Sequence, residues 1–200
     1  MRRRTVLLAA ALSAFALAGC GLTRPAVEIH TYLVVAGAPQ GNKAASPLRI
    51  RVTPFDIAPQ YEGKPLIYRF SDARFEADFY NEFLVSPRLM LQQQTAEWLR
   101  AAGHDASTAA RGNAYRLRAK VIRMYGDFRQ PQQPRAVLDV VFVLDAPDGG
   151  STVLEREYAV STPIADRSAD SVARGLGEAL GQVLTQLHTD LQAVGQPDAH

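Results

Sequence analysis

The sequence is poor in cysteine, because Cys20 is the only one among 200 residues. A single cysteine cannot close an internal disulfide, so the fold must be stable without one even in an oxidising compartment. Long apolar runs are scarce as well. The run at residues 6–17 is interrupted only by Ser13, yet it is shorter than the roughly 20 apolar residues that a membrane-spanning helix needs.

An excess of charge of one sign is also absent. The chain has 22 lysines and arginines against 20 aspartates and glutamates, and three of the basic residues are Arg2, Arg3 and Arg4. The remaining sequence is close to neutral and contains no block of like charges. Nucleic-acid binding requires a basic patch, so we expect no nucleic-acid partner, and a polybasic mode of membrane binding is equally unsupported.

Motifs for catalysis or cofactor binding are missing. The sequence has no G-x-S-x-G nucleophile elbow and no phosphate-binding loop. Four histidines are scattered along the chain without a metal-ligand spacing, namely His30, His104, His188 and His200. We expect His188 to be a surface or boundary residue. The sequence therefore predicts no catalytic residue, no metal site and no cofactor.

One acidic cluster leaves a catalytic alternative open. Its members fall within eleven positions and are Asp72, Glu76, Asp78 and Glu82. Two of them could act as the acid and base of a periplasmic glycosidase, because that reaction needs paired carboxylates. A solvated face of a strand or helix is the preferred interpretation.

The N-terminus carries the most specific pattern in the chain. Three arginines, the apolar run and Leu17-Ala18-Gly19-Cys20 follow one another in the order typical of a secretory signal peptide. The last four residues also resemble the bacterial lipobox. That resemblance implies that residues 1–19 are removed and that Cys20 carries a diacylglycerol and an N-acyl chain, which together anchor the protein to a membrane. Glycine at position 21 favours the outer membrane, with the domain facing the periplasm.

The mature sequence suits a single domain. We expect residues 20–29 to form the lipid-anchored tether, residues 30–195 the domain and residues 196–200 a short tail. Alternating or β-branched apolar residues predict strands at 31–35, 48–53, 66–70, 114–125, 136–146 and 153–162. Residues 74–80 fit a strand, although the spacing of Phe75 and Phe79 also suits a helix. Residues 55–63 and 104–113 are predicted loops.

Two helices are predicted. The first begins at Ser86-Pro87, a favoured N-cap and first-turn pair, and ends near Gly103. The second covers residues 168–194, where apolar residues recur at three- and four-residue steps, and we expect its Gly175 and Gly177 to pack closely against the sheet. The pattern predicts an α/β fold that borders on α+β, in which a mixed sheet of about six strands is covered by two main helices.

Aromatic residues are concentrated between Tyr61 and Phe83. Most of them are expected to fill the core, and the alternative is an exposed patch or groove for a partner or an acyl chain. The candidate contact residues are Tyr61, Pro65, Tyr68, Phe75, Phe79 and Tyr80.

The order of several segments resembles the ABC-type transport auxiliary lipoprotein family. These segments are the lipobox, Leu48 to Phe55, Tyr61 to Arg69, and Tyr125-Gly-Asp-Phe128. The chain departs from the family at Phe79–Phe83, where family members often have a tryptophan.

The resemblance implies a three-layer sandwich and a non-catalytic subunit in the outer membrane. It implies an MCE-domain protein as partner, together with an ABC permease and ATPase that move lipids between the two membranes. It also suggests phospholipid contact and a homo-oligomer.

Three functions therefore stand at this point. The first is a docking or acceptor lipoprotein of an intermembrane lipid transporter, and the second is a structural lipoprotein that assists assembly of an outer-membrane complex without handling lipid. The third is a periplasmic hydrolase. A continuous groove beside Tyr61 to Phe83 would favour the first function, whereas a filled core would favour the second.

Overall fold

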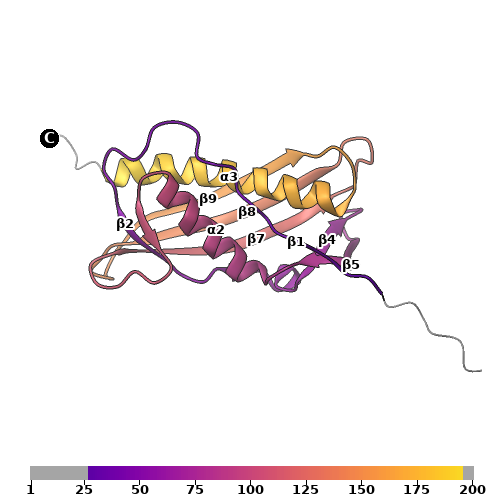
Figure 1. The fold of residues 1–200 in the computed structure, drawn as a ribbon, viewed down its shortest axis with the longest axis horizontal. Coiled ribbons are helices and arrows are strands. Elements are labelled where there is room, and N and C mark those ends of the chain that lie inside the picture. Colours follow the sequence, from indigo (N-terminus) through magenta and orange to yellow (C-terminus); the bar gives the residue numbers. More distant parts are fainter. Residues whose placement is uncertain (1–26, 196–200) are drawn as a thin grey trace, which may run out of the picture.

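The computed structural model describes residues 27–195 (Figure 1). The predicted signal peptide, Cys20, most of the predicted tether and the predicted tail at 196–200 lie outside the described residues. The strands and helices follow one another as β1 (His30–Tyr32), β2 (Arg49–Val52), β3 (Asp56–Ile57), η1 (Pro59–Tyr61), β4 (Pro65–Arg69), β5 (Phe75–Phe83), α2 (Pro87–Ala101), β6 (Asp105–Ser107), β7 (Tyr115–Asp127), β8 (Arg135–Asp145), β9 (Thr152–Pro163) and α3 (Ala169–Val194).

The sheet is mixed and is organised around β7. On one side β7 pairs with β8, which pairs with β9, and both ladders are antiparallel. The other edge of β7 is shared by three short parallel strands, with β2 at its beginning, β3 in the middle and β4 at its end. The strands β6, β5 and β1 complete the sheet beyond β2 and β4.

Both helices lie on the same face of this sheet (Figure 1). Helix α3 packs along β8 and β9, and α2 contacts α3 through Trp98, whose ring lies 6.1 Å from that of His188. The opposite face of β7 carries the exposed Arg116, Arg118 and Lys120. The α/β fold with a mixed sheet and two main helices is confirmed. The face of the long strands away from α2 and α3 is largely polar, and the short helix η1 lies on it, with Tyr61 beside Tyr125 of β7.

A crossing segment, residues 33–47, connects β1 to β2 over the helices. Its backbone is held by α2: the Val34 N–H points at Met90 Sδ, and the Trp98 indole N–H donates to the Gly37 carbonyl over 2.8 Å. A Cβ at Gly177 of α3 would overlap the Val35 carbonyl oxygen. Gly177 therefore packs against this segment and not against the sheet, whereas Gly175 does face the sheet, at Ala136 of β8.

Most predicted elements are present, with bounds shifted by a few residues. Residues 75–83 form a strand, so the helical alternative for this stretch is wrong. The hairpin turn between β8 and β9 contains Gly149 with a φ of +74°. The two predicted loops contain short strands, β3 and β6, that the sequence pattern does not reveal. The sheet accordingly has nine strands where about six were expected.

Candidate functional site

Two of the predicted contact residues, Tyr61 and Phe75, meet on the outer face of the sheet, the face away from the helices. They flank Tyr125 of β7, with ring centroids 5.9 Å and 5.5 Å from it. The Arg69 guanidinium lies 5.4 Å from the centre of the Phe75 ring and donates to the Tyr125 hydroxyl over 3.2 Å. We call these four residues the aromatic–arginine cluster. Burial raises the pKa of the Tyr61 hydroxyl.

A small open cavity of about 300 Å³ adjoins this cluster. It is lined by Gln60, Tyr61, Ile67, Phe75, Glu76 and Ala77. The remaining predicted contact residues lie elsewhere, so the stretch from Tyr61 to Phe83 does not form one continuous groove.

The other predicted contact residues are divided between the helix side and an edge of the sheet. Tyr68 lies on the helix side, stacked on Phe128 at 5.1 Å. Pro65 is half-buried in β4 and paired with Glu82 of β5. Phe79 and Tyr80 are exposed, at 72% and 54%.

A bulge in β5 exposes Phe79 and Tyr80. Between the pairs Pro65–Glu82 and Ile67–Ala77, β4 advances two residues while β5 advances five. The extra residues are held by Asp78, whose carboxylate accepts hydrogen bonds from the backbone N–H of Tyr80 and of Asn81 over 2.8 and 3.1 Å. Bulges of this kind re-aim side chains at sheet edges. We call residues 78–81 the β5 bulge.

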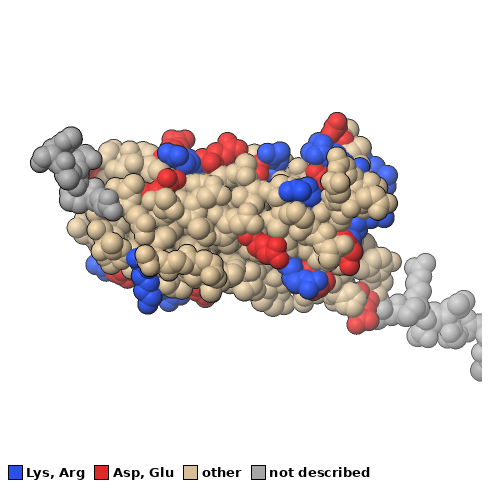
Figure 2. All heavy atoms as spheres, turned by 90° about the horizontal axis from the view of Figure 1, so that it is seen from above, with Lys and Arg blue, Asp and Glu red and all other residues tan. Residues whose placement is uncertain are grey.

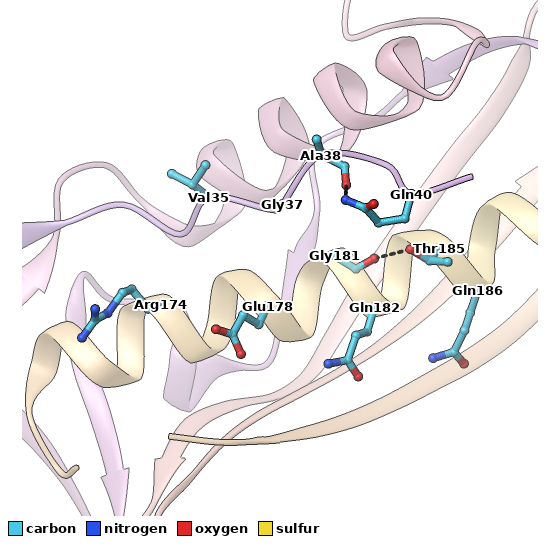
Figure 3. A pocket seen from close by; sticks show the side chains of 10 residues that line it. All are labelled: Val35, Gly37, Ala38, Gln40, Arg174, Glu178, Gly181, Gln182, Thr185 and Gln186. Carbon is cyan, nitrogen blue, oxygen red and sulfur yellow. Dashed lines mark hydrogen bonds between the residues drawn. The ribbon is translucent and has the colours of Figure 1, made fainter. Parts of the chain in front are cut away.

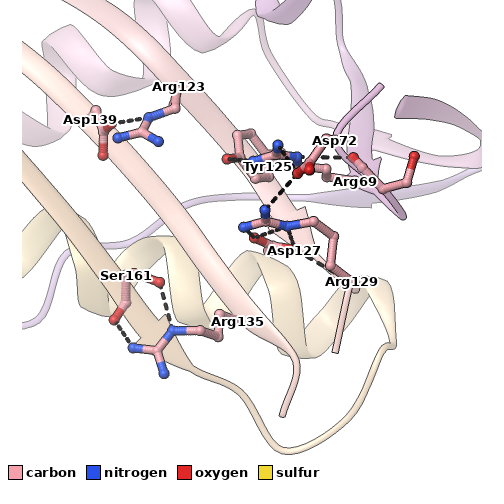
Figure 4. A network of polar contacts seen from close by, with 10 residues as sticks. Arg69, Asp72, Arg123, Tyr125, Asp127, Arg129, Arg135, Asp139 and Ser161 are labelled. Atoms are coloured by element: carbon pink, nitrogen blue, oxygen red, sulfur yellow. Dashed lines mark hydrogen bonds and ion pairs between the residues drawn. The ribbon is translucent and has the colours of Figure 1, made fainter. Parts of the chain in front are cut away.

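A polar network lies next to the aromatic–arginine cluster on the outer face of the sheet (Figure 4). Asp72 accepts from Arg69 and from Arg129, both over 2.9 Å, and Arg129 also binds Asp127. Burial alone would raise the pKa of Asp127, but the hydrogen bonds from Arg129 outweigh it and lower that pKa. Each charge is therefore neutralised by a neighbour within the protein.

The acidic cluster of the sequence is dispersed in the fold. Asp72 pairs with arginines, Glu76 with Arg74, Glu82 with Lys64, and Asp78 holds the β5 bulge. These contacts are four separate pairings and do not form the facing carboxylates that glycoside hydrolysis needs. The structure therefore does not support the catalytic interpretation, and it adds ion pairs and hydrogen bonds to the predicted solvated face.

An open groove of about 770 Å³ runs between the crossing segment and α3 (Figure 3). Gly181 and Thr185 lie on the side of α3 nearest the segment, and a Cβ at Gly181 would be 3.5 Å from the Gly37 nitrogen. The groove is lined by Val35, Gly37, Ala38, Gln40, Arg174, Glu178, Gly181, Gln182, Thr185 and Gln186. Small and uncharged side chains dominate this lining, which we call the α3 groove. On the face seen in Figure 2, acidic and basic residues are interspersed, with no broad area of one sign.

A buried histidine pair was not anticipated from the sequence. His104, just after α2, and His188 of α3 are 84 positions apart, yet His104 Nε2 lies 3.1 Å from His188 Nδ1. The Leu48 N–H donates to His104 Nδ1 over 3.2 Å, so the neutral His104 carries its proton on Nε2 and donates to His188. The prediction of a surface or boundary position for His188 is wrong, because its side chain is buried and lies against Trp98 and His104. Among residues 27–195 no cluster of three metal-ligating side chains occurs.

A family model described as "ABC-type transport auxiliary lipoprotein component" matches residues 32–188. The chain belongs to this family. The match begins in β1 and ends in α3, so it includes the crossing segment, the β5 bulge and every residue that lines the α3 groove. Among curated proteins none matches the sequence.

Two solved structures share the family's fold as seen here. A crystal structure of a protein from Xanthomonas campestris superposes with a TM-score of 0.72 at 18% identity, covering 86% of this chain and 98% of the other. A crystal structure of an uncharacterised protein gives a TM-score of 0.62 at 13% identity, covering 84% and 99%. At these identities the similarity establishes the fold alone.

The family is that of an auxiliary transport component, and the surfaces described here suit contact more than chemistry. Arg69, Asp72, Asp127 and Arg129 on the outer face are paired with one another, and the α3 groove is lined mainly by small side chains and amides. Neither helix of residues 27–195 is both long enough and apolar enough to cross a membrane.

Proposed function

We propose that the protein is an outer-membrane lipoprotein, anchored through Cys20, that serves as a non-catalytic subunit of an ABC-type intermembrane lipid transport system. In this function it docks the periplasmic end of an MCE-domain protein. The observation that carries the proposal is the family match over residues 32–188. The lipobox-like Leu17-Ala18-Gly19-Cys20 supports the anchor, and Gly21 supports the outer membrane.

The filled interior of the domain favours a docking role over a role in which the domain encloses a lipid molecule. The space between sheet and helices is filled by fully buried side chains, among them Leu138, Phe142 and Leu180. The α3 groove and the cavity beside Tyr61 are open to solvent and lie on the surface. A lipid handed over by the transporter would therefore pass along the protein and not through its core.

The α3 groove is the surface on which we place the MCE-domain partner. Its lining residues Gly37, Ala38 and Gly181 allow close approach of a second polypeptide. The amides of Gln40, Gln182 and Gln186 supply hydrogen-bonding groups without a net charge. Such a surface combines apolar contact with a polar rim, as protein interfaces do.

Site-specific photo-crosslinking in cells tests this assignment. A photoreactive amino acid at Gln182, which lines the groove and is exposed, is expected to crosslink to the MCE-domain protein. The same amino acid at Thr189, exposed on α3 but outside the groove lining, is the matched control and is expected to give no such product. Crosslinks from position 182 only to outer-membrane assembly proteins, or to a second copy of this chain, would contradict the assignment.

The filled interior also favours a second function. A structural lipoprotein that assists assembly of an outer-membrane complex needs an anchored, rigid domain and no lipid-binding cavity. The two functions differ in the partner that is recovered, and the crosslinking experiment separates them.

A further inference from the structure

Exposed apolar side chains gather at the end of the domain where the described chain begins. Phe79 and Tyr80 in the β5 bulge are joined there by Val27 and Ile29, which are 52% and 54% exposed. Figure 1 shows the first described residues leaving the domain beside β5. A group of four exposed apolar side chains at one end of a domain typically marks a site of contact with another protein or a membrane.

The strand pairing fixes this neighbourhood. β1 runs parallel to β5, with His30 opposite Asn81, and the Tyr32 hydroxyl donates to the Asn81 side chain over 3.0 Å. Residues 27–29 therefore leave the ladder on the same side as residues 78–80. The start of the domain and the β5 bulge are held together by the sheet.

The β5 bulge is a preorganised feature of the fold. Asp78 receives four hydrogen bonds, from the Tyr68 hydroxyl, the Tyr80 and Asn81 N–H groups and the Asn81 amide. The Phe79 and Tyr80 rings pack edge to face, with centroids 5.1 Å apart. Because the backbone and the rings are fixed in advance, exposing these aromatics to a partner costs little ordering entropy.

The length of chain outside the structure points to the partner. Only residues 21–26 separate Cys20 from Val27, and seven peptide steps span at most about 25 Å. A lipid anchor on Cys20 would thus hold this end of the domain near the bilayer surface. Aromatic rings with one polar tip, such as that of Tyr80, favour the headgroup region of a bilayer.

We infer that Phe79 and Tyr80, flanked by Val27 and Ile29, insert into the interfacial region of the phospholipid bilayer that holds the anchor. This inference rests on the lipidation of Cys20 in the proposed function. The contact is apolar, because the charged residues near it do not attract anionic lipid. Glu76 and Glu82 are paired with Arg74 and Lys64, respectively. The exposed Glu28 carries the same sign of charge as an anionic headgroup. The contact should therefore form on zwitterionic phospholipid and change little with salt.

The contact gives the domain an orientation that the acyl chains alone do not give. A lipobox product carries enough acyl chains for stable anchoring, so the aromatics are not needed for retention. A single attachment at Cys20 does not set the orientation of the domain, whereas a second contact at the β5 bulge fixes which end faces the membrane. The other end of β7 then points into the periplasm, about 40 Å away at the usual rise per residue.

Depth-dependent fluorescence quenching tests the inference. The full-length lipoprotein would be purified in detergent with Phe79→Trp and reconstituted into phosphatidylcholine vesicles whose acyl chains carry bromine at graded depths. The native Trp98 is buried and serves as an internal reference. The matched control is Val153→Trp, an exposed position on β9 at the end of the sheet that lies beside the start of β7. Vesicle flotation is measured on the same samples.

The expected result is that both variants float with the vesicles and that shallow bromines quench the added emission of Phe79→Trp at least twofold, with no quenching of the added emission of Val153→Trp. If the protein floats but the Phe79→Trp emission is not quenched, the anchor of the proposed function stands and this inference fails. If the indole of Phe79→Trp is shielded only at high protein density, a second copy covers the bulge and the inference also fails. If the protein does not float, both the anchor and the inference fail.

Discussion

The Tyr68 hydroxyl donates a 2.7 Å hydrogen bond to the Asp78 carboxylate, joining the helix side of the sheet to the bulge that exposes Phe79 and Tyr80. Burial of Asp78 would by itself raise its pKa, but the hydrogen bonds from Tyr68, Tyr80 and Asn81 outweigh burial and lower it. Burial, reinforced by the bond to Asp78, raises the pKa of the Tyr68 hydroxyl. The bulge is therefore tied to the core through a charged hydrogen bond.

Removing hydrogen bonds to Asp78 should destabilise the domain, and the loss of stability should grow with the number of bonds removed. Tyr68→Phe is expected to lower the free energy of unfolding by about 1.5 kcal/mol, because one hydrogen bond to a charged group is lost. Asp78→Ala removes four such bonds and is expected to cost about 2–3 kcal/mol. Urea denaturation measures both. Tyr80→Phe, which changes an exposed hydroxyl, is the control, and an equal loss in that variant would contradict the account.

The buried histidine pair should make stability depend on pH. Burial, with a smaller effect from His188, lowers the pKa of His104 to about 4, whereas an unfolded histidine titrates near 6.5. Between these values the unfolded chain binds a proton that the folded chain does not. The stabilisation is therefore complete above about pH 6.5 and is lost as the pH falls towards 4, by up to about 3 kcal/mol.

Chemical denaturation at pH 7 and pH 4.5 checks this dependence. His104→Asn should be less stable at pH 7 and should show a smaller loss on acidification than the parent. His30→Gln, at an exposed histidine, should leave the pH dependence unchanged. If the parent and His104→Asn lose the same free energy between the two pH values, carboxylates and not the histidine pair control the acid response.

Two glycines of α3 should respond in opposite ways to the same substitution. Gly177→Ala puts a methyl group into the Val35 carbonyl of the crossing segment, and we expect a loss of at least about 2 kcal/mol. Gly181→Ala meets its nearest atom at 3.5 Å and should be neutral or stabilising by up to about 1 kcal/mol, since alanine favours helix. Thermal unfolding distinguishes them, and similar melting temperatures for the two variants would show that the crossing segment is not packed as described.

Removing one partner of a buried ion pair on the outer face should lower the free energy of unfolding. Replacing both partners by apolar residues should lower it much less. Asp139 of β8 is 2% exposed and pairs with Arg123 of β7. Arg123→Ala leaves a buried carboxylate without its partner and should cost about 3 kcal/mol. The double variant Arg123→Leu with Asp139→Leu should recover most of that loss. A double variant no more stable than Arg123→Ala would mean that the pair itself supplies the stability.

The anchor prediction concerns retention and not folding. Cys20→Ala should release the protein from membranes into the periplasmic fraction, because the acyl chains provide its attachment. The far-ultraviolet circular dichroism spectrum and melting temperature should match those of the parent, since the described core is built from residues between Val34 and Leu191. A Cys20→Ala protein that remains membrane-bound and fully active in cells would rule out tethering through this residue.

Most of the secondary structure was predictable from periodicity. The polar outer face of the sheet could have been predicted in the same way. Leu48, Ile50 and Val52 alternate with polar residues, and the structure places them inward on and next to β2. Arg116, Arg118 and Lys120 alternate with buried residues in the same way, which indicates one solvent-facing side of β7. That signal agrees with the placement of α2 and α3 on the opposite face of the sheet. The strands β3 and β6 are too short to show a period, and they form because β7 and β2 offer parallel edges to them.

The candidate site was predicted in composition but not in arrangement. The aromatic stretch does supply Tyr61 and Phe75 to one cluster, yet its other members Arg69 and Tyr125 depend on strand pairing between distant segments. Phe79 and Tyr80 do not follow the alternation of a regular strand, because β5 has three more residues than β4 between the flanking pairs. The periodicity of the β5 sequence does not determine its register with β4. The pairing of His104 with His188 depends on how two helices pack, which spacing in the sequence does not report.

The most direct test of the proposed function is the identity of the partner. The full-length lipoprotein should be purified from its native membranes in a gentle detergent, with bound proteins identified by mass spectrometry and Gln182→Trp purified in parallel as a variant with a blocked α3 groove. We predict recovery of an MCE-domain protein, with or without its permease and ATPase, with the parent and at least tenfold less with Gln182→Trp. Recovery of outer-membrane assembly proteins alone would contradict the transport function and favour the structural one.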